Sequence, residues 1–173
     1  LVQSIRAQRD WRADDVAQVR VATHSLSRAL LGRDTSSRLA AMFSLPFVVS
    51  TAVVNGSVDP ETMRPGSQPF LAARAFMVRV EAEVDDSFDA YLPHQRCTEV
   101  SITFTDGDHI SLGQSNPIGD ADHFPLGADD IQQKLVTLIG LEDTTTVQNV
   151  VRALPTADDA TSALAALALC QTR

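Results

Sequence analysis

Four side chains of this chain titrate in the range where a general base works, and they are His24, His94, His109 and His123. His24 follows an expected strand and stands beside Ser25, so it is a candidate for proton transfer, with a turn or interface role as the alternative. His123 is the second candidate, because it belongs with Asp120 and Asp122 to an Asp-x-Asp-His cluster in a long loop. That cluster is either a ligand set or lid, or a solvated acidic loop, since a metal site needs more ligands than sequence proximity supplies.

The other histidines and the two cysteines belong to no known catalytic or metal-binding motif. His109 falls at an outward-facing position of an expected hairpin, which favours the surface, and His94 has no informative neighbours. Cys97 and Cys170 are isolated and lack a Cys-x-x-Cys spacing, so neither a zinc site nor a disulfide framework is expected. The sequence contains no Gly-x-Ser-x-Gly, phosphate loop or dinucleotide fingerprint. We therefore expect no metal and no cofactor.

The segment from Phe43 to Val58 is the most distinctive part of the chain. Pro46 is followed by eight uncharged residues, and a proline is tolerated in a first helical turn because its missing N–H has no helical partner there. The segment predicts a buried helix that starts near Pro46 and stops at Asn55-Gly56. Ser44, Pro46 and Phe47 then become candidates for the wall of a substrate pocket. The alternative is that Phe43 and Phe47, four residues apart, pack in an ordinary core.

Charge and hydropathy exclude two classes of partner. A formal net charge of −8 and a pI near 4.8 argue against nucleic acid, whose binding needs clustered Lys and Arg. Residues 1–40 hold seven arginines against four aspartates, so Arg20, Arg28 and Arg38 either attract an anionic substrate or form a solvated face. The uncharged run from Leu39 to Val58 contains several polar residues, which favours a buried helix over a membrane span. No signal peptide pattern is visible, so a cytoplasmic location is expected.

The hydrophobic pattern predicts four strands. Alternation marks the strands 18–23, 78–84 and 100–105, and residues 110–112 supply a returning strand. Asp106-Gly107 between the last two strands is typical of a two-residue type I′ turn, so an antiparallel hairpin is expected here. A polar connection, 85–96, precedes the hairpin.

Helices and one long loop account for the rest of the chain. Helices are expected over 36–55, 70–75, 131–139 and 158–169, with a further one around 147–154 whose start Thr145 and Gln148 mark as a capping box. Residues 115–127, rich in Pro and Gly, form a loop of about a dozen residues. The order of elements predicts a single α+β domain over residues 1–173, with an antiparallel sheet of about four strands covered by helices.

Several segments together resemble the MmgE/PrpD family. Residues 38–47, Arg-Leu-Ala-Ala-Met-Phe-Ser-Leu-Pro-Phe, with the trailing Asn55-Gly56, are similar to the family's Ala-x-Phe-Ser-Leu-Pro-Tyr segment and its Asp/Asn-Gly. The strand that ends at Asp106-Gly107 is also similar, and so is the Gly-Asp…Pro-Leu…Lys stretch formed by Gly119-Asp120, Pro125-Leu126 and Lys134. These matches keep the family's order over about four-fifths of the chain.

The resemblance implies the C-terminal domain of a longer, cofactor-independent enzyme. The family includes 2-methylcitrate dehydratase of propionate catabolism, cis-aconitate decarboxylase and iminodisuccinate epimerase, which abstract a proton beside a carboxylate. Its main His and Lys residues lie in a helical domain that precedes the region similar to this chain. The resemblance therefore implies that residues 1–173 are inactive alone, that they contribute a pocket wall or lid for a di- or tricarboxylate, and that the full-length enzyme is a homodimer.

Phe47 stands where several family members have a tyrosine after Leu-Pro. A phenol can donate a proton or a hydrogen bond and a phenyl ring cannot, so a tyrosine-dependent step is in doubt here. This departure supports an alternative of a different class, a non-catalytic binding or oligomerisation module in which the apolar helix forms a subunit interface. The specific carboxylate does not follow from the sequence.

Overall fold

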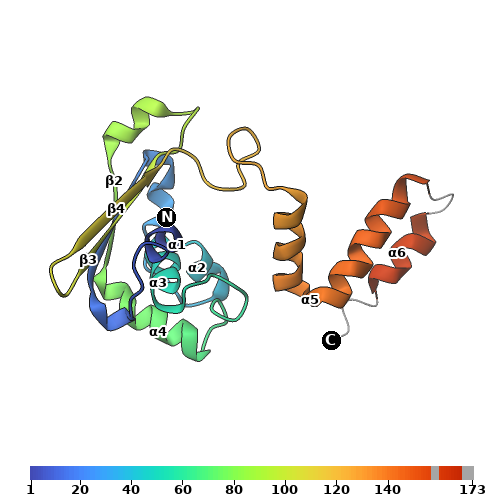
Figure 1. The fold of residues 1–173 in the computed structure, drawn as a ribbon, viewed down its shortest axis with the longest axis horizontal. Coiled ribbons are helices and arrows are strands. Elements are labelled where there is room, and N and C mark those ends of the chain that lie inside the picture. The colour runs from blue at the N-terminus through green and yellow to red at the C-terminus, as the bar shows by residue number, and fades with distance from the viewer. Residues whose placement is uncertain (157–159, 169–173) are drawn as a thin grey trace. The chain divides into compact units, whose positions relative to one another are not determined.

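The computed structural model describes residues 1–156 and 160–168 of the 173 residues. The chain divides into two compact units, residues 1–124 and 125–173 (Figure 1). The first unit holds the sheet and the helices packed on it, and the second holds helices.

A four-stranded sheet organises the first unit. Its strands are β1 (Val16–Thr23), β2 (Val80–Val84), β3 (Thr98–Phe104) and β4 (His109–Gln114), in the spatial order β2-β1-β3-β4. β3 pairs antiparallel with both β1 and β4, whereas β1 and β2 run parallel. A parallel pair needs a crossover connection, which the helices between β1 and β2 supply. The α+β class is confirmed, with a sheet that is mixed but mostly antiparallel.

All four predicted strands differ from the observed ones at their ends, and β3 and β4 span Thr98–Phe104 and His109–Gln114 where 100–105 and 110–112 were expected. β1 begins at Val16, two residues before the predicted start. β2 begins at Val80 and not at Val78, because residues Met77–Arg79 form a turn of 3-10 helix and the Val78 side chain is 82% exposed. Alternation of apolar residues therefore located β2 correctly and overestimated its length.

Helices cover one face of the sheet. They are α1 (Val2–Arg6), α2 (Arg38–Met42), α3 (Leu45–Asn55) and α4 (Gln68–Phe76). Figure 1 shows α1, α2 and α3 on the same side of the strands. The main core forms between this layer and the sheet, where Val49 and Val53 of α3 pack with Val19, Val100 and other inward-facing strand residues. Burial of such side chains is the main favourable contribution to folding.

α3 is buried on two sides, as predicted for the apolar helix. One side contacts the sheet core, and the other carries Phe47 into a second cluster with Phe70 and Ala73 of α4. The predicted single helix over 36–55 is nevertheless wrong, because the chain leaves helical geometry between α2 and α3. Pro46 is the physical reason, since a proline ring clashes with the carbonyl four residues earlier, here that of Met42.

The β3–β4 hairpin is confirmed, but its turn is not the predicted type. The Gly107 N–H donates to the Phe104 carbonyl and the Phe104 N–H donates to the Asp108 carbonyl, so three residues form the loop. A type I′ turn needs positive φ at both central residues. In the described part of the chain only glycines have positive φ, here Gly107 at 92°. Asp106 therefore keeps an ordinary φ, and the glycine alone adopts the left-handed one.

Short 3-10 helices connect the elements of the first unit. They are η1 (Ala13–Asp15), η2 (Ser25–Leu30), η3 (Met77–Arg79) and η4 (Asp86–Tyr91). η4 lies inside the connection predicted as polar, and Asp89 in it accepts a hydrogen bond of 2.8 Å from the Ser25 N–H. This contact holds η4 beside η2, next to the end of β1. Residues 115–127 join β4 to the second unit without a helix or strand, as predicted.

The second unit contains α5 (Ala128–Ala153), η5 (Leu154–Thr156) and α6 (Ala160–Ala168). α5 is interrupted at Gly140, whose φ of 81° and ψ of 167° are not helical. The two predicted helices are thus present, but the break falls at Gly140. The prediction of a capping box at Thr145 is wrong, because Thr145 lies inside the helix and its hydroxyl donates to the Leu141 carbonyl. The predicted last helix, 158–169, agrees with α6 except for its ends, which lie outside the described residues.

Candidate functional site

Ser44, Pro46 and Phe47 are buried in the first unit and shape the start of α3. The Ser44 hydroxyl donates to the Gly32 carbonyl at 2.7 Å and accepts a hydrogen bond from the Phe47 N–H at 3.3 Å. Pro46 occupies the first turn, and the Phe47 side chain is fully buried. These three side chains position the helix, while Phe43 is 60% exposed and does not share the core with Phe47.

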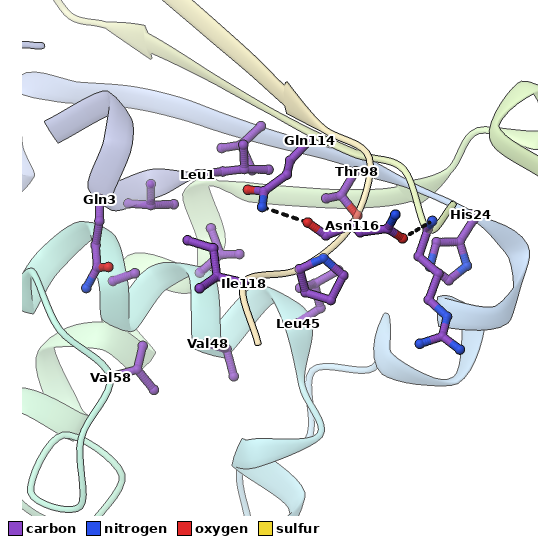
Figure 2. Close-up of a pocket in the computed structure, with 16 residues that line it drawn as sticks. Leu1, Gln3, His24, Leu45, Val48, Val58, Thr98, Gln114, Asn116 and Ile118 are labelled. Atoms are coloured by element: carbon purple, nitrogen blue, oxygen red, sulfur yellow. Dashed lines mark hydrogen bonds between the residues drawn. The ribbon is translucent and has the colours of Figure 1, made fainter. Parts of the chain in front are cut away.

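The opposite side of α3 forms a wall of a pocket of about 620 Å³ (Figure 2). Leu45, Val48 and Ala52 line this wall. A volume of this size lies in the range of small-molecule sites. The predicted pocket residues Ser44, Pro46 and Phe47 therefore belong to the segment that lines the pocket but do not line it themselves. Their neighbours on α3 form the wall.

Three other parts of the first unit complete the pocket. Leu1 and Val2 contribute from the α1 end, Val100 contributes from β3, and Pro117 and Ile118 come from the loop after β4. Figure 2 shows Leu45, Val48 and Ile118 around one part of the hollow, with Asn116 and His24 toward its other end. The pocket is thus apolar over most of its surface and polar at one end.

The polar end arises from strand register. Thr23 of β1 pairs with Thr98 of β3, and Thr98 also pairs with Gln114 of β4. Because the β1–β3 pair is antiparallel, the residue after Thr23 and the residues before Thr98 meet at the same edge of the sheet. His24 and Arg96 are brought together in this way.

Asn116 fixes this edge through its side chain. Its Oδ1 accepts a hydrogen bond of 3.1 Å from the Arg96 N–H, while its carbonyl accepts one of 2.6 Å from the Gln114 Nε2. Both bonds are visible in Figure 2. The Arg96 N–H also donates to the Ser115 carbonyl at 2.7 Å. The backbone that carries Arg96 is therefore held firmly against the loop after β4.

His24 is buried at the pocket with one nitrogen unpaired. Its side chain is 7% exposed, its Nε2 lies 3.3 Å from the Ser27 hydroxyl, and its Nδ1 has no hydrogen-bond partner. Burial lowers the pKa of His24 below its ordinary value of 6.5; Asp89 opposes the shift and Arg96 adds to it. The structure thus favours the neutral imidazole, which can act as an acceptor or a donor of one proton.

Arg96 is the positive charge of the pocket and was not among the arginines singled out in the sequence. In the part of the chain that the structure describes, no carboxylate forms an ion pair with it, whereas Arg20 pairs with Glu83 and Arg28 lies 3.9 Å from Asp86. Arg38 starts α2 and does not line the pocket. The only sequence signal for Arg96 is its place just before the third strand, at the end of a polar connection.

His123 lies away from the pocket lining, in the loop after β4. Its Nδ1 is 2.9 Å from Asp120 Oδ1, and the same oxygen accepts hydrogen bonds from the Asp122 and His123 N–H groups. These hydrogen bonds lower the pKa of Asp120, and the bond from the His123 side chain has the largest effect. Within residues 1–156 and 160–168, no group of three or more His, Cys, Asp and Glu side chains could hold a metal ion.

The other residues considered in the sequence lie apart from the pocket. His109 is exposed on the outer face of the sheet, with its Nδ1 3.3 Å from the Thr103 hydroxyl, as predicted. His94 contributes only its carbonyl to the Asn116 amide at 3.5 Å. Cys97 is a free thiol, and Cys170 lies outside the described residues. No helix within the described residues is long and apolar enough to cross a membrane.

A comparison with protein-family models gives a match. The family model described as the MmgE/PrpD C-terminal domain matches residues 1–154, which include the sheet, α3 and the pocket. No curated protein sequence matches the chain.

Proposed function

Since the chain belongs to the MmgE/PrpD family, through its C-terminal domain, we propose that it is the C-terminal part of a lyase or epimerase for a di- or tricarboxylate. The family includes dehydratases and decarboxylases that need no cofactor. In the proposed reaction, a base removes a proton beside a carboxylate, and water or carbon dioxide then leaves or the proton returns on the other face. The family match over residues 1–154 is the observation that carries this proposal.

The proposed role of this domain is to supply a wall or lid of the active site. The His and Lys residues that carry the chemistry would come from a helical domain upstream of Leu1, in a cytoplasmic homodimer. The motif segment supports this division, because its Ser44, Pro46 and Phe47 cap and pack the start of α3 and none of them is a base. Phe47 has a packing role in this proposal and no role in proton transfer.

The burial of α3 favours the enzyme over an interaction module. The alternative function uses this apolar helix as a subunit interface, which requires apolar side chains that the fold leaves uncovered. Phe47, Val49 and Val53 are instead buried within the first unit, on two sides of the helix. The hydrophobic surface of α3 is therefore used in folding, apart from the side of Leu45, Val48 and Ala52 that lines the pocket.

Incorporation of solvent deuterium tests the proposal for all three reaction types at once, because each begins with proton abstraction. The full-length protein in D₂O is incubated with 2-methylcitrate, cis-aconitate or iminodisuccinate, and substrate and product are followed by proton NMR. We expect exchange or turnover with one of them, and none from residues 1–173 alone. Absence of exchange with every substrate by the folded full-length protein would contradict the function.

The activity of residues 1–173 alone tests which domain contains the base. Robust turnover by residues 1–173 alone would show that the base lies in this domain and would overturn the lid role. The conservative variant Phe47→Leu in the full-length protein, with its fold verified by circular dichroism, separates two further cases: loss of activity with the oligomer intact supports a role of this segment at the active site, and loss of the oligomer supports an interface.

A further inference from the structure

Apolar side chains form most of the pocket lining. Leu45, Val48 and Ala52 of α3 line it together with Ile118 from the loop after β4 and Val100 of β3. Transfer of apolar groups from water into such a surface is favourable in proportion to the area buried. A ligand that fills this part must therefore carry an aliphatic body, which a small, fully polar polycarboxylate lacks.

The polar part of the pocket has most of its hydrogen-bonding groups already occupied. Five of its six polar lining side chains have at least one partner within the protein, and these are Gln3, His24, Thr98, Gln114 and Asn116. Two further groups can still bind a ligand, the exposed Arg96 guanidinium, for which the described residues provide no ion pair, and the buried His24 Nδ1. A buried nitrogen without a partner is costly, and each such group in a folded protein needs an explanation.

These two groups line the same pocket at the same edge of the sheet. The charge of Arg96 contributes to the low pKa of His24, and both residues are at the edge where β1 and β3 end. Asp89 also acts on His24, but its Oδ1 accepts the Ser25 N–H and Asp89 does not line the pocket. The charge at the pocket itself is therefore positive, and it is complementary to a single anionic group.

We propose that this pocket is a binding site for an amphipathic monocarboxylate, a carboxylate group on a short aliphatic chain. Arg96 binds the carboxylate through its guanidinium, which matches the geometry of a carboxylate better than any other side chain. His24 Nδ1 gains a partner in the same carboxylate, and α3 with Ile118 holds the aliphatic chain. The site is distinct in ligand class from the proposed substrate, and it does not depend on the lyase assignment because binding needs no turnover.

A homologous series of ligands tests the site with the whole 173-residue chain. Butyrate, pentanoate, hexanoate and octanoate are titrated by calorimetry and by ¹H–¹⁵N NMR. We expect the affinity to rise by about fourfold for each added methylene, because each buries comparable apolar area. The amide signals that shift should be those of Val48, Ala52 and Ile118. Equal affinity along the series would overturn the proposal, since the apolar part would then be unused.

The charge requirement is tested with one ligand change and two protein variants. Hexanamide should bind about tenfold more weakly than hexanoate, and Arg96→Gln should lose about the same factor for hexanoate because one charge-assisted contact disappears. Arg74→Gln is the matched control, since Arg74 is exposed on α4 and outside the pocket, and it should bind hexanoate like the parent chain.

Filling the pocket provides a test that leaves Arg96 in place. Ala52→Leu places extra carbon atoms on the wall of α3, so binding of octanoate should fall more than that of butyrate. NMR spectra of each variant verify its fold. Tighter binding of tricarballylate, a tricarboxylate, than of hexanoate would overturn the monocarboxylate class. Absence of saturable binding across the series by the folded chain would overturn the site itself, and neither outcome bears on proton abstraction by the full-length protein.

Discussion

The ring of Phe47 in α3 lies against the ring of Phe70 in α4, with centroids 4.7 Å apart and planes inclined by 47°. Such tilted aromatic pairs contribute beyond the area that they bury. Both side chains belong to the second core cluster, which ties α4 to the face of α3 that points away from the sheet. Phe47 is therefore a structural anchor for the helix that walls the pocket.

Replacement of Phe47 should be strongly destabilising, whereas replacement of Phe43 should not. Phe47→Ala removes a fully buried ring and leaves a cavity, so we expect a loss of about 3–5 kcal/mol in the free energy of unfolding. Phe43→Ala is the matched control, because the same change at a mostly exposed position costs about 0.5 kcal/mol or less. Urea unfolding of both variants measures the difference, and similar losses would contradict the assignment of Phe47 to the core.

Ser44 gives a second prediction about the same helix. Its hydroxyl caps α3 and donates to the Gly32 carbonyl, so Ser44→Ala should cost about 1–2 kcal/mol in the free energy of unfolding. Ser37 caps the short α2 at an exposed position, and Ser37→Ala should cost about 0.5 kcal/mol. Urea unfolding again decides, and a larger loss for Ser37→Ala would contradict the role given to Ser44.

The start and end of α3 were predictable from the sequence because the residues that set them lie next to one another in the chain. Pro46 in the first turn and Gly56 after the last turn act within a few residues, and the structure uses both; the cap at Ser44 is equally local but was not predicted. The break before Ser44 depends on the same proline, acting on the carbonyl of Met42, and the apolar pattern of the sequence concealed it. Gly140 is comparable, because a single glycine in a helical pattern predicts neither a break nor its position.

The pocket was not predictable because its parts meet only through long-range pairing. His24 was a candidate because its side chain can transfer a proton. Its position near Arg96, however, depends on the pairing of Thr23 with Thr98, 75 residues apart. Asn116 likewise reaches this edge only after the β3–β4 hairpin closes. Composition and spacing identify such residues one at a time, and strand register decides which of them share a site.

Gly56 provides a test of the backbone at the end of α3. Its φ of 77° is left-handed, so Gly56→Ala should cost about 1–2 kcal/mol in the free energy of unfolding. Gly32→Ala is the contrast, because Gly32 has no left-handed φ and open space around its Cα, and it should be neutral or stabilising by about 0.4–1 kcal/mol. Thermal or urea unfolding compares the two, and a loss of stability from Gly32→Ala equal to that from Gly56→Ala would contradict the argument.

His24 should make the stability of the fold sensitive to acid. The pKa of His24 in the folded state is lower than its ordinary value of 6.5, so the unfolded chain takes up a proton at His24 more readily than the folded chain. The contribution of His24 to the free energy of unfolding is therefore unaffected well above pH 6.5 and becomes less favourable as the pH falls below it. His24→Gln removes this group, and its stability relative to the parent chain should improve on acidification.

The neighbouring charges allow a sharper version of the same test. Burial is the main cause of the low pKa and Arg96 adds to it, so Arg96→Gln should reduce the acid-dependent loss of stability, while Arg74→Gln should leave it unchanged. Asp89 acts in the opposite direction, so Asp89→Asn should increase the loss. Urea unfolding between about pH 5 and pH 8 measures the four variants. Identical pH profiles for His24→Gln and the parent chain would show that His24 is not the buried titrating group.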